Sequence, residues 1–300
     1  MRRVVYPAPA MNRSHPSDLP ETHLPDLRFV PTESILPHEQ HDPQRLEPLV
    51  RKIREESALK NPPVVTVLSG NGTPDARYVV LDGANRSTAA RAAGFPHMVV
   101  QVVQYDDRHV RLTTWNHALS SYPHAELEPA LGHIAGLRCA RTDRLHARAM
   151  LARREALAWI HFDDDAVLAL QGGTNLQERN ALLNQVVDTY RVHGRFYRVE
   201  GDGLRQARSR HSDVTALAVF PHFEPAEILE LAKSGDRLPA GITRHLVRWR
   251  ALRINVPIER LADTKHSLES KNEWLAEWVR ERLAMRQVRY YEEPTVLFDE

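Results

Sequence analysis

The sequence predicts an α+β protein with two domains, and three observations carry that prediction. Its 300 residues are enough for two ordinary domains. Short runs of β-branched residues alternate with segments whose apolar residues recur at helical spacing. The clearest example is residues 78–103, where a strand at Tyr78–Leu81 precedes a turn at Gly83, an alanine-rich helix that ends at Gly94, and a strand at Met98–Val103.

Composition and charge exclude several classes of protein. Lys and Arg total 40 against 39 for Asp and Glu, so no overall field draws the chain to nucleic acid or to a membrane surface. A single cysteine excludes an internal disulfide and fits a reducing cytosol. The chain has no apolar run long enough to span a membrane and no secretory signal peptide. We therefore expect a soluble, cytoplasmic protein.

The first predicted domain, residues 26–119, follows a proline-rich arm at residues 1–25 that is expected to be extended. Its first strand is predicted at Leu27–Val30. A helix at 43–57 follows, because its apolar residues share one face. Val64–Leu68 is the next strand, and it leads through a glycine-rich turn to the strands and helix described above.

The turn after Tyr78–Leu81 has the features of an anion-binding loop. A glycine there lets the backbone approach a ligand, the following helix directs its free N–H groups at the turn, and an arginine adds a planar cation. Neither the Walker pattern nor the dinucleotide-binding glycine pattern occurs. A plain strand–turn–helix corner with an N-capping serine is the alternative, and the residues alone leave both open. The predicted phosphate-binding residues are Gly83, Ala84, Asn85, Arg86, Ser87 and Thr88.

The second predicted domain, residues 120–300, is expected to be mixed and largely helical. Helical spacing predicts helices at 124–140, 144–159, 175–191, 225–232 and about 264–287. Runs of β-branched residues predict strands at 166–170, 196–200 and 214–220. The basic segment 201–212 is predicted to be a loop. The last helix either caps the second domain or pairs in a homodimer.

A proline–glycine turn at 238–241 delivers three polar side chains into one short segment. Thr243, Arg244 and His245 bring a hydroxyl, a guanidinium and an imidazole close together. Such a set suits a small zwitterion, because arginine pairs with a carboxylate through two parallel hydrogen bonds. The alternative is an exposed loop that enters a strand.

These motifs resemble a known family. A strand, then Asp-Gly-x-[Asn/His]-Arg, then a short helix ending in glycine and a Val-rich strand is similar to the core of the ParB/sulfiredoxin-like fold. Sulfiredoxins carry a cysteine where Ala84 stands, and ParB partition proteins carry Gly-Glu-Arg-Arg in the loop and a helix-turn-helix after it. The loop at 82–86 is most similar to that of the free-serine kinases, including the siderophore-linked branch of the staphyloferrin B type.

The resemblance implies a nucleotide-binding first domain, closed by a second domain that brings substrate-binding residues. It implies phosphoryl transfer from ATP, or from ADP as in a related branch, to free L-serine, with Mg²⁺. The product would be O-phospho-L-serine, feeding siderophore or diaminopropionate-type precursors.

The resemblance also implies catalytic residues. His38-Glu39 matches a His-Glu pair in these kinases, so Glu39 would take the proton of the substrate hydroxyl. Asp82 would place substrate or ligate the metal. Without the resemblance, Glu39 would be interpreted as a solvated loop residue and Asp82 as a turn residue that bonds the backbone.

The substrate site follows from a Pro-x-x-[Ser/Thr]-x-[His/Phe] segment that binds the serine carboxylate in these kinases, together with a tryptophan after the last strand of the first domain. The arginine that follows the segment would be Arg248 or Arg250, and we prefer Arg250. The predicted substrate-binding residues are His38, Trp115, Thr243, Arg244, His245 and Arg250.

Two other functions compete. A ParB-like, nucleotide-switched DNA-binding regulator is opposed by the near-zero net charge and by the lack of a recognisable helix-turn-helix after the first domain. A degenerate sulfiredoxin-like enzyme is opposed by Ala84, because the reactive thiol would be missing.

Overall fold

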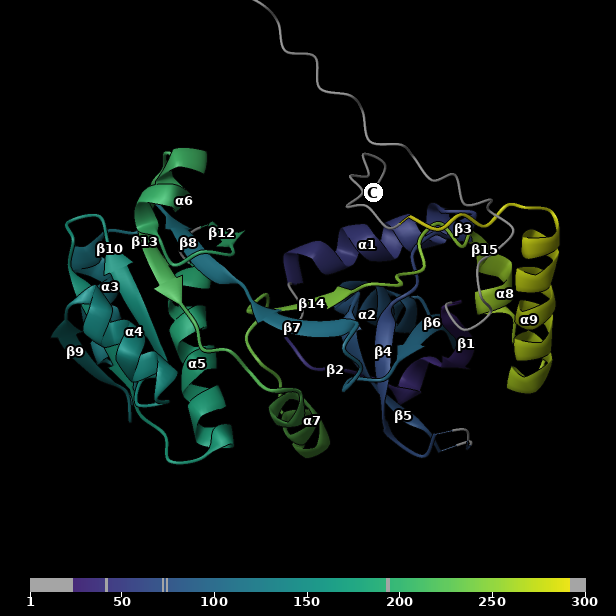
Figure 1. Cartoon of the computed structure of the whole chain (residues 1–300), viewed down its shortest axis with the longest axis horizontal. Coiled ribbons are helices and arrows are strands. Elements are labelled where there is room, and N and C mark those ends of the chain that lie inside the picture. Colours follow the sequence, from purple (N-terminus) through teal and green to yellow (C-terminus); the bar gives the residue numbers. More distant parts are fainter. Residues whose placement is uncertain (1–23, 41–42, 72, 74, 193–194, 292–300) are drawn as a thin grey trace, which may run out of the picture.

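A computed structural model of the chain describes residues 24–40, 43–71, 73, 75–192 and 195–291. Almost all of the predicted proline-rich arm at 1–25 lies outside the described residues. The described residues form two adjoining bodies, each built on its own sheet (Figure 1). Among them, no helix is long and apolar enough to cross a membrane.

The first body is built on a five-stranded mixed sheet with the order β1-β6-β4-β5-β2. Its β-branched runs are buried, as expected for inner strands that are covered on both faces. Strands β4 and β5 pair antiparallel, whereas β4 with β6 and β2 with β5 pair parallel. The strands are β1 (Asp26–Pro31), β2 (Ile35–Pro37), β4 (Val64–Ser69), β5 (Arg77–Asp82) and β6 (His97–Val103).

Two helices of the first body contact each other beside this sheet: α1 (Pro43–Glu55) and α2 (Ala84–Ala92). A single turn of 3-10 helix, η2 (Thr32–Ser34), joins β1 to β2. Helix α2 begins after Gly83 and ends shortly before Gly94, and both glycines have the left-handed backbone conformation, with φ of 90° and 79°. The predicted order of strand, glycine turn, helix, glycine and strand is confirmed.

The second body is built on a six-stranded antiparallel sheet with the order β12-β8-β13-β10-β11-β9. The strands are β8 (Asn116–Ser120), β9 (Arg138–Thr142), β10 (Ala158–Phe162), β11 (Val167–Gln171), β12 (Phe196–Val199) and β13 (Val214–Val219). The helices are α3 (His124–Gly132), α4 (Arg144–Ala152), α5 (Leu176–Arg191), α6 (Leu204–Arg210) and α7 (Pro225–Ser234).

Three segments of the second body differ from the prediction. The helices expected at 124–140 and 144–159 extend too far, because their last residues form the strands β9 and β10. Positive φ angles at Gly136 and Arg154 end the helical conformation, and pairing with β11 then fixes both segments as strands. The segment 201–212, expected to be a loop, contains α6. The second body therefore holds more strand than we expected.

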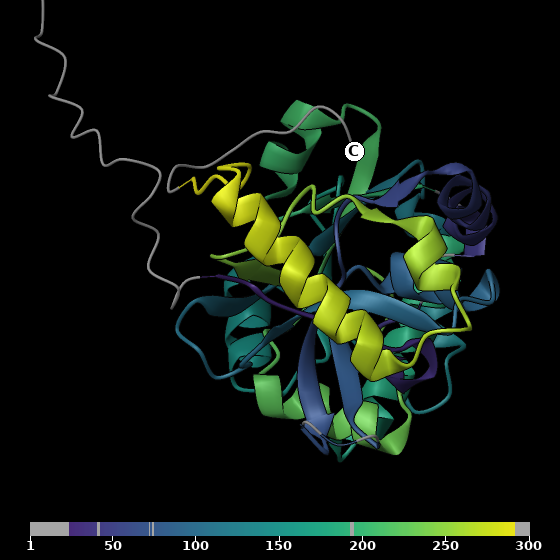
Figure 2. The ribbon, with the colours of Figure 1, turned by 90° about the vertical axis from the view of Figure 1, so that its right-hand side faces the viewer.

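The end of the chain returns to the first body. Strand β14 (Thr243–Val247) pairs with β7 (Val110–Thr114), and β15 (Val256–Pro257) pairs with β3 (Ala58–Leu59). Helix α8 (Ile258–Ala262) contacts β6, and α9 (Leu268–Ala284) contacts β1. Figure 2 shows α9 lying diagonally across this side of the molecule.

This packing differs from the linear division at residue 119. That boundary cuts the end of β8, which belongs to the second sheet. Helix α9 covers the first body instead of capping the second, because Leu275 is buried there and the Asn272 amide bonds both backbone groups of Phe29, at 2.8 and 3.0 Å. One apolar core cluster joins Val79 and Leu81 to the second body, so the two bodies share a buried contact.

Candidate active site

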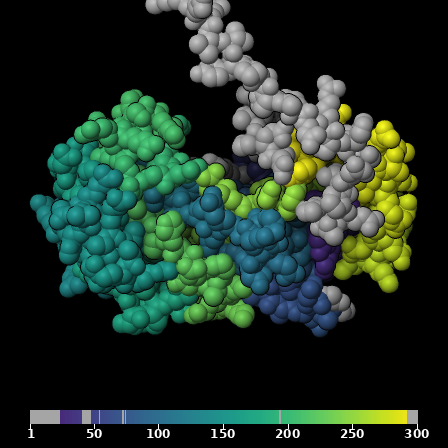
Figure 3. Space-filling model, in the orientation of Figure 1, coloured from purple at the N-terminus to yellow at the C-terminus, as the bar shows by residue number. Residues whose placement is uncertain are grey.

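A cleft with a volume of about 640 Å³ lies where the two bodies meet. Figure 3 shows the notch that separates the two bodies on this face of the molecule. The first body contributes residues 38–40 after β2, helix α1 and the β5–α2 turn, and the second contributes β12. Strand β14 and Trp115, which follows β7, add residues from between the two. Its charged lining is Lys52, Lys60, Arg86, Arg198, Arg244 and Arg250 together with the carboxylates Glu39, Glu56 and Asp82. The excess of cations suits a polyanionic ligand.

The glycine turn forms one wall of this cleft. A Cβ at Gly83 would lie 3.0 Å from the Pro63 Cα and 3.2 Å from the Arg86 guanidinium, so the φ of 90° and the close packing both require glycine. The amino terminus of α2 follows directly, and free N–H groups at a helix terminus attract anions. Gly83, Ala84, Asn85 and Arg86 all line the cleft.

Two of the predicted phosphate-binding residues lie outside the cleft lining. Ser87 is buried, and its hydroxyl donates to the Ala84 carbonyl at 2.9 Å, within the first turn of α2. Thr88 follows it on the helix and is also absent from the lining. The structure therefore brings four of the six residues to the cleft: Gly83, Ala84, Asn85 and Arg86.

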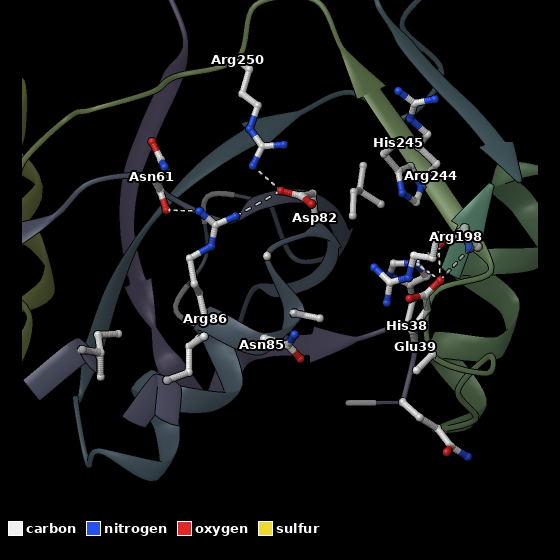
Figure 4. A pocket seen from close by; sticks show the side chains of 18 of the residues that line it. His38, Glu39, Asn61, Asp82, Asn85, Arg86, Arg198, Arg244, His245 and Arg250 are labelled. Atoms are coloured by element: carbon white, nitrogen blue, oxygen red, sulfur yellow. Dashed lines mark hydrogen bonds and ion pairs between the residues drawn. The ribbon is translucent and has the colours of Figure 1, made fainter. Parts of the chain in front are cut away.

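Asp82 is held between two arginines at this wall (Figure 4). Its Oδ2 accepts hydrogen bonds from Arg250 and, at 3.2 Å, from Arg86, which also donates to the Asn61 carbonyl at 2.8 Å. Burial raises the pKa of Asp82, but the positive charges of Arg250 and Arg86 outweigh burial, so the pKa is below its ordinary value. Asp82 is thus ionised, and the group of three carries a net positive charge.

Glu39 is fixed at the other side of the cleft. Its Oε1 accepts from the Thr243 backbone N–H at 2.7 Å and from the Thr243 hydroxyl at 2.5 Å, and its Oε2 accepts from the Gly241 N–H at 2.8 Å. The backbone pairs with the same turn, because the Gln40 N–H bonds the Leu238 carbonyl at 2.8 Å. The carboxylate is therefore held in one orientation by a turn that is distant in sequence.

Two histidines lie behind this carboxylate. His38 is 3% exposed; its Nδ1 bonds the Val80 carbonyl and its Nε2 lies 2.7 Å from the Thr243 hydroxyl. His245 meets His38 edge to face, with ring centroids 5.2 Å apart, and its Nε2 lies 2.7 Å from the Tyr105 hydroxyl. Burial, reinforced by His38, lowers the pKa of His245 to about 3, so this ring is neutral at physiological pH.

The remaining predicted substrate residues also reach the cleft. The Arg244 guanidinium lies 4.5 Å from the centre of the Trp115 ring and forms an ion pair with Glu200. Arg250 lines the cleft, in agreement with the preference stated above, whereas Arg248 is absent from the lining and its backbone N–H bonds the His109 carbonyl.

Sequence reasoning missed several lining residues. Arg198, on β12, lies against Gly241, so that any side chain at position 241 would collide with its guanidinium. Lys52 and Lys60 flank Glu56 at 3.9 and 3.8 Å, at the end of the cleft near α1. The four-residue spacing of Glu56 and Lys60 indicates a surface ion pair and does not indicate a binding site. No local sequence pattern places Arg198 beside the turn at 241.

The described residues contain no group of three or more His, Cys, Asp or Glu side chains that could hold a metal ion. The site instead offers one fixed carboxylate, Glu39, opposite a cationic cradle around Gly83. In Figure 4, Arg86, Asp82 and Arg250 lie on one side of the cavity, and Glu39, His38 and Arg244 lie on the other. This arrangement can hold a phosphorylated ligand against a group whose proton Glu39 can accept.

Known proteins share both the sequence and the fold. An "ATP-dependent L-serine kinase" of Staphylothermus marinus is 24% identical over 255 residues, which is 81% of this chain and 96% of that protein. The "ATP-dependent L-serine kinase SbnI" of Staphylococcus aureus is 24% identical over 258 residues, 84% of this chain and 91% of that protein. Over most of its length the chain is therefore similar to proteins named L-serine kinases.

Solved structures of such kinases share the fold of this chain. A free serine kinase in complex with AMP has a TM-score of 0.64 and 20% identity, and the match covers 79% of this chain and 94% of that one. Truncated SbnI has a TM-score of 0.64 and 21% identity, covering 85% and 96%. No protein-family model matches the sequence. The predicted α+β, ParB/sulfiredoxin-like fold and its resemblance to the serine kinases are confirmed.

Proposed function

We propose that this chain is a free L-serine kinase that transfers the γ-phosphoryl group of ATP to the serine hydroxyl and releases O-phospho-L-serine. The observation that carries the proposal is Glu39, a carboxylate held by three hydrogen-bond donors opposite an anion cradle. Relatives of this chain are named ATP-dependent L-serine kinases, and one from Thermococcus kodakarensis is named an ADP-dependent L-serine kinase.

The nucleotide phosphates would bind at the amino terminus of α2. The backbone at Gly83 and Ala84 is accessible there, and Asn85 and Arg86 add side-chain donors. Arg86 and Arg250 would also stabilise the charge that develops on the phosphoryl oxygens, since positioned cations contribute most of what phosphoryl transfer requires.

Magnesium is proposed to accompany the nucleotide. The residues present fit it to a limited degree: Asp82 Oδ2 accepts from both arginines, and Oδ1 takes part in neither bond. Mg²⁺ at such sites is commonly held by one or two carboxylates and the substrate phosphates, so Asp82 would be the protein ligand. When bound, the ion would neutralise charge on the phosphates.

The serine would lie between Glu39 and the turn at 241–245. Arg244, stacked on Trp115, and Arg250 are the cations proposed to pair with its carboxylate. In the reaction the serine oxygen bonds phosphorus, the bond from phosphorus to the bridging oxygen breaks with its electron pair going to ADP, and Glu39 receives the hydroxyl proton. A weak base suffices, because the transition state of phosphoryl transfer is loose and bond formation precedes full proton loss.

The alternative of a ParB-like DNA-binding regulator gains no support from the fold. Residues after β7 enter the six-stranded sheet through β8. The basic residues of α6 lie on a helix of only 7 residues.

The test is direct. Purified protein is incubated with Mg²⁺, L-serine and either ATP or ADP, and O-phosphoserine is followed by mass spectrometry, with L-threonine and L-homoserine as competing acceptors. We expect product with ATP and serine. If product forms only with ADP, the donor is ADP and the proposed donor is corrected. If no product forms with ATP or with ADP, from protein that binds ATP, the proposal is refuted.

A further inference from the structure

Arg198 is the one residue of the six-stranded sheet among the described residues that line the cleft. It lies on β12, an edge strand of that sheet, opposite His117 of β8. Its neighbour Val199 is buried in a core cluster with Leu204 and Ala207 of α6. Successive side chains of a strand point to opposite faces, so Arg198 points away from that cluster and toward the cleft.

The positive charge of Arg198 is not neutralised by any described residue. In the part of the chain that the structure describes, no carboxylate forms an ion pair with its guanidinium and no acceptor receives a hydrogen bond from it. The other cations that line the cleft each have a carboxylate in ion-pair range; they are Lys52, Lys60, Arg86, Arg244 and Arg250. Of the cations in this lining, Arg198 is therefore the one whose charge is available to an anionic ligand.

Arg198 and Glu39 are positioned by the same residue, Gly241. The Gly241 N–H donates to Glu39 Oε2 at 2.8 Å, and its carbonyl accepts from His117 Nε2 at 3.1 Å. The Arg198 guanidinium lies against the Cα of Gly241, in the space that a side chain would need. This cation is thus held beside the carboxylate proposed to act as the base, and Figure 4 shows both on the same side of the cavity.

The position of Arg198 matters because phosphoryl transfer moves charge across the cleft. Arg86 and Arg250, with Asp82, lie on the opposite side, where the nucleotide phosphates are proposed to bind. As transfer proceeds, the bond from phosphorus to the bridging oxygen of ADP breaks, the bond to the serine oxygen forms, and Glu39 receives the hydroxyl proton. The phosphoryl group therefore ends nearer to Glu39 than it began, on the side of Arg198.

We propose that Arg198 binds the transferred phosphoryl group, first in the transition state and then as the phosphate of O-phospho-L-serine. This assignment rests on the proposed kinase function, and it adds a contact from the second body to a site built mainly from the first body and β14. A guanidinium suits the role, since it stays charged and its planar set of N–H donors can pair with a phosphate in a bidentate manner. Cations that contact the phosphoryl group in the transition state lower the barrier to its transfer.

The serine carboxylate is the competing anion for Arg198, and two features favour the phosphate. Arg198 shares Gly241 with Glu39, which the serine hydroxyl must approach, and the hydroxyl is the end of serine that becomes phosphorylated. Arg244 and Arg250 are already assigned to the carboxylate. The phosphate is therefore the anion that forms closest to Arg198.

Binding of the product without catalysis tests the assignment. Isothermal titration calorimetry compares O-phospho-L-serine with L-serine in the absence of nucleotide, so that no phosphoryl group can be transferred. Arg198→Gln should raise the Kd of O-phosphoserine roughly 10–100-fold and change the Kd of L-serine by less than about twofold, because only the product carries the phosphate. Arg198→Lys should lose less, since its charge remains and only the bidentate pairing is lost.

Three results of the titration would overturn the proposal. An equal rise in Kd for both ligands would assign Arg198 to the serine carboxylate. An unchanged Kd for both ligands would show that Arg198 contacts neither of them. Wild-type protein that binds L-serine but not O-phosphoserine would show that no cation holds the product phosphate.

Arg205→Gln is the matched control, at an exposed arginine of α6 that lies outside the cleft lining. It removes one positive charge from the same body and should bind both ligands as the wild type does. Arg198→Gln should also keep the wild-type thermal midpoint, because its guanidinium has no hydrogen bond or ion pair with a described residue to lose. A loss of binding in Arg198→Gln would then not reflect unfolding.

Kinetics separate failure of this assignment from failure of the kinase proposal. With ATP and L-serine, Arg198→Gln should lower kcat roughly 10–100-fold with little change in the KM for L-serine, since the contact forms as the phosphoryl group arrives. A wild-type kcat in Arg198→Gln would overturn the role of Arg198 and leave the kinase function intact. Absence of O-phosphoserine from wild-type protein with either ATP or ADP would instead refute the kinase proposal.

Discussion

Gly241→Ala tests how the turn at 241 holds the site. Gly241 has a φ of 79°, its N–H bonds Glu39 Oε2 at 2.8 Å, and its carbonyl lies 3.1 Å from His117 Nε2. An alanine in the left-handed conformation costs about 1–2 kcal/mol. The new Cβ would also collide with the Arg198 guanidinium, which is the flexible end of that side chain and can move away. The free energy of unfolding should therefore fall only by the cost of placing alanine in the left-handed conformation.

The loss of catalytic activity should be larger than the loss of stability. The displaced Arg198 removes a cation from the cleft, and a hydrogen bond from such a cation to a charged ligand contributes about 1.5–3 kcal/mol. At about 1.4 kcal/mol for each factor of ten, kcat/KM for serine phosphorylation should fall roughly 10–100-fold. Steady-state kinetics with ATP and L-serine measures this fall.

Gly235→Ala is the matched control. Gly235 has a φ of 81° at the carboxyl end of α7, and a Cβ there would meet no heavy atom within 4 Å. Both variants should lower the thermal midpoint by a similar amount, roughly 2–8 °C for 1–2 kcal/mol. Only Gly241→Ala should lose activity. Equal activity in the two variants would refute the role assigned to the turn.

Three further predictions follow from other contacts. Arg250→Lys should raise the KM for L-serine roughly tenfold or more with little change in the KM for ATP, because lysine cannot pair in a bidentate manner; an unchanged serine KM would remove Arg250 from the site. Asn272→Ala should lower the free energy of unfolding by about 1–3 kcal/mol in urea, because two hydrogen bonds to Phe29 are lost; an unaltered midpoint would contradict the docking of α9. Burial lowers the pKa of His124, but hydrogen bonds to Asp164 and Glu128 outweigh burial and raise this pKa above its ordinary 6.5. The protonated His124 therefore stabilises the fold fully below about pH 6.5, and this stabilisation is lost as pH rises through the folded pKa. His124→Gln should flatten the dependence of unfolding free energy on pH across that window, and an identical dependence in the variant would be inconsistent with this ion pair.

Local sequence patterns predicted most of the first body. Its strands are short runs of β-branched residues, and the glycine turns at 83 and 94 have the positive φ angles that the pattern requires. Gly83, Ala84, Asn85 and Arg86, four of the six predicted phosphate-binding residues, line the cleft within this one stretch, so a local pattern could point to them. Ser87, which is predicted to bind phosphate, lies outside the cleft lining, and its hydroxyl donates to the Ala84 carbonyl in the first turn of its own helix.

Features that depend on contacts between residues far apart in the chain could not be predicted from the sequence. Residues 138–142 contain alanine and arginine, which favour helix locally, but antiparallel pairing with β11 makes them a strand. The donors of Glu39 are 202 and 204 residues away in the chain, and Arg198 reaches the cleft only because β12 lies beside β8. The return of α9 to the first sheet depends in the same way on contacts with Phe29.

The measurement that tests the account most directly compares wild type with Glu39→Gln in single-turnover formation of O-phosphoserine at saturating ATP and L-serine. The fixed carboxylate predicts that Glu39→Gln binds ATP normally and forms product roughly 10²–10⁴-fold more slowly. Glu55→Gln, at an exposed glutamate of α1 outside the cleft, should match the wild type. An unchanged rate in Glu39→Gln would contradict the assignment of Glu39 as the base.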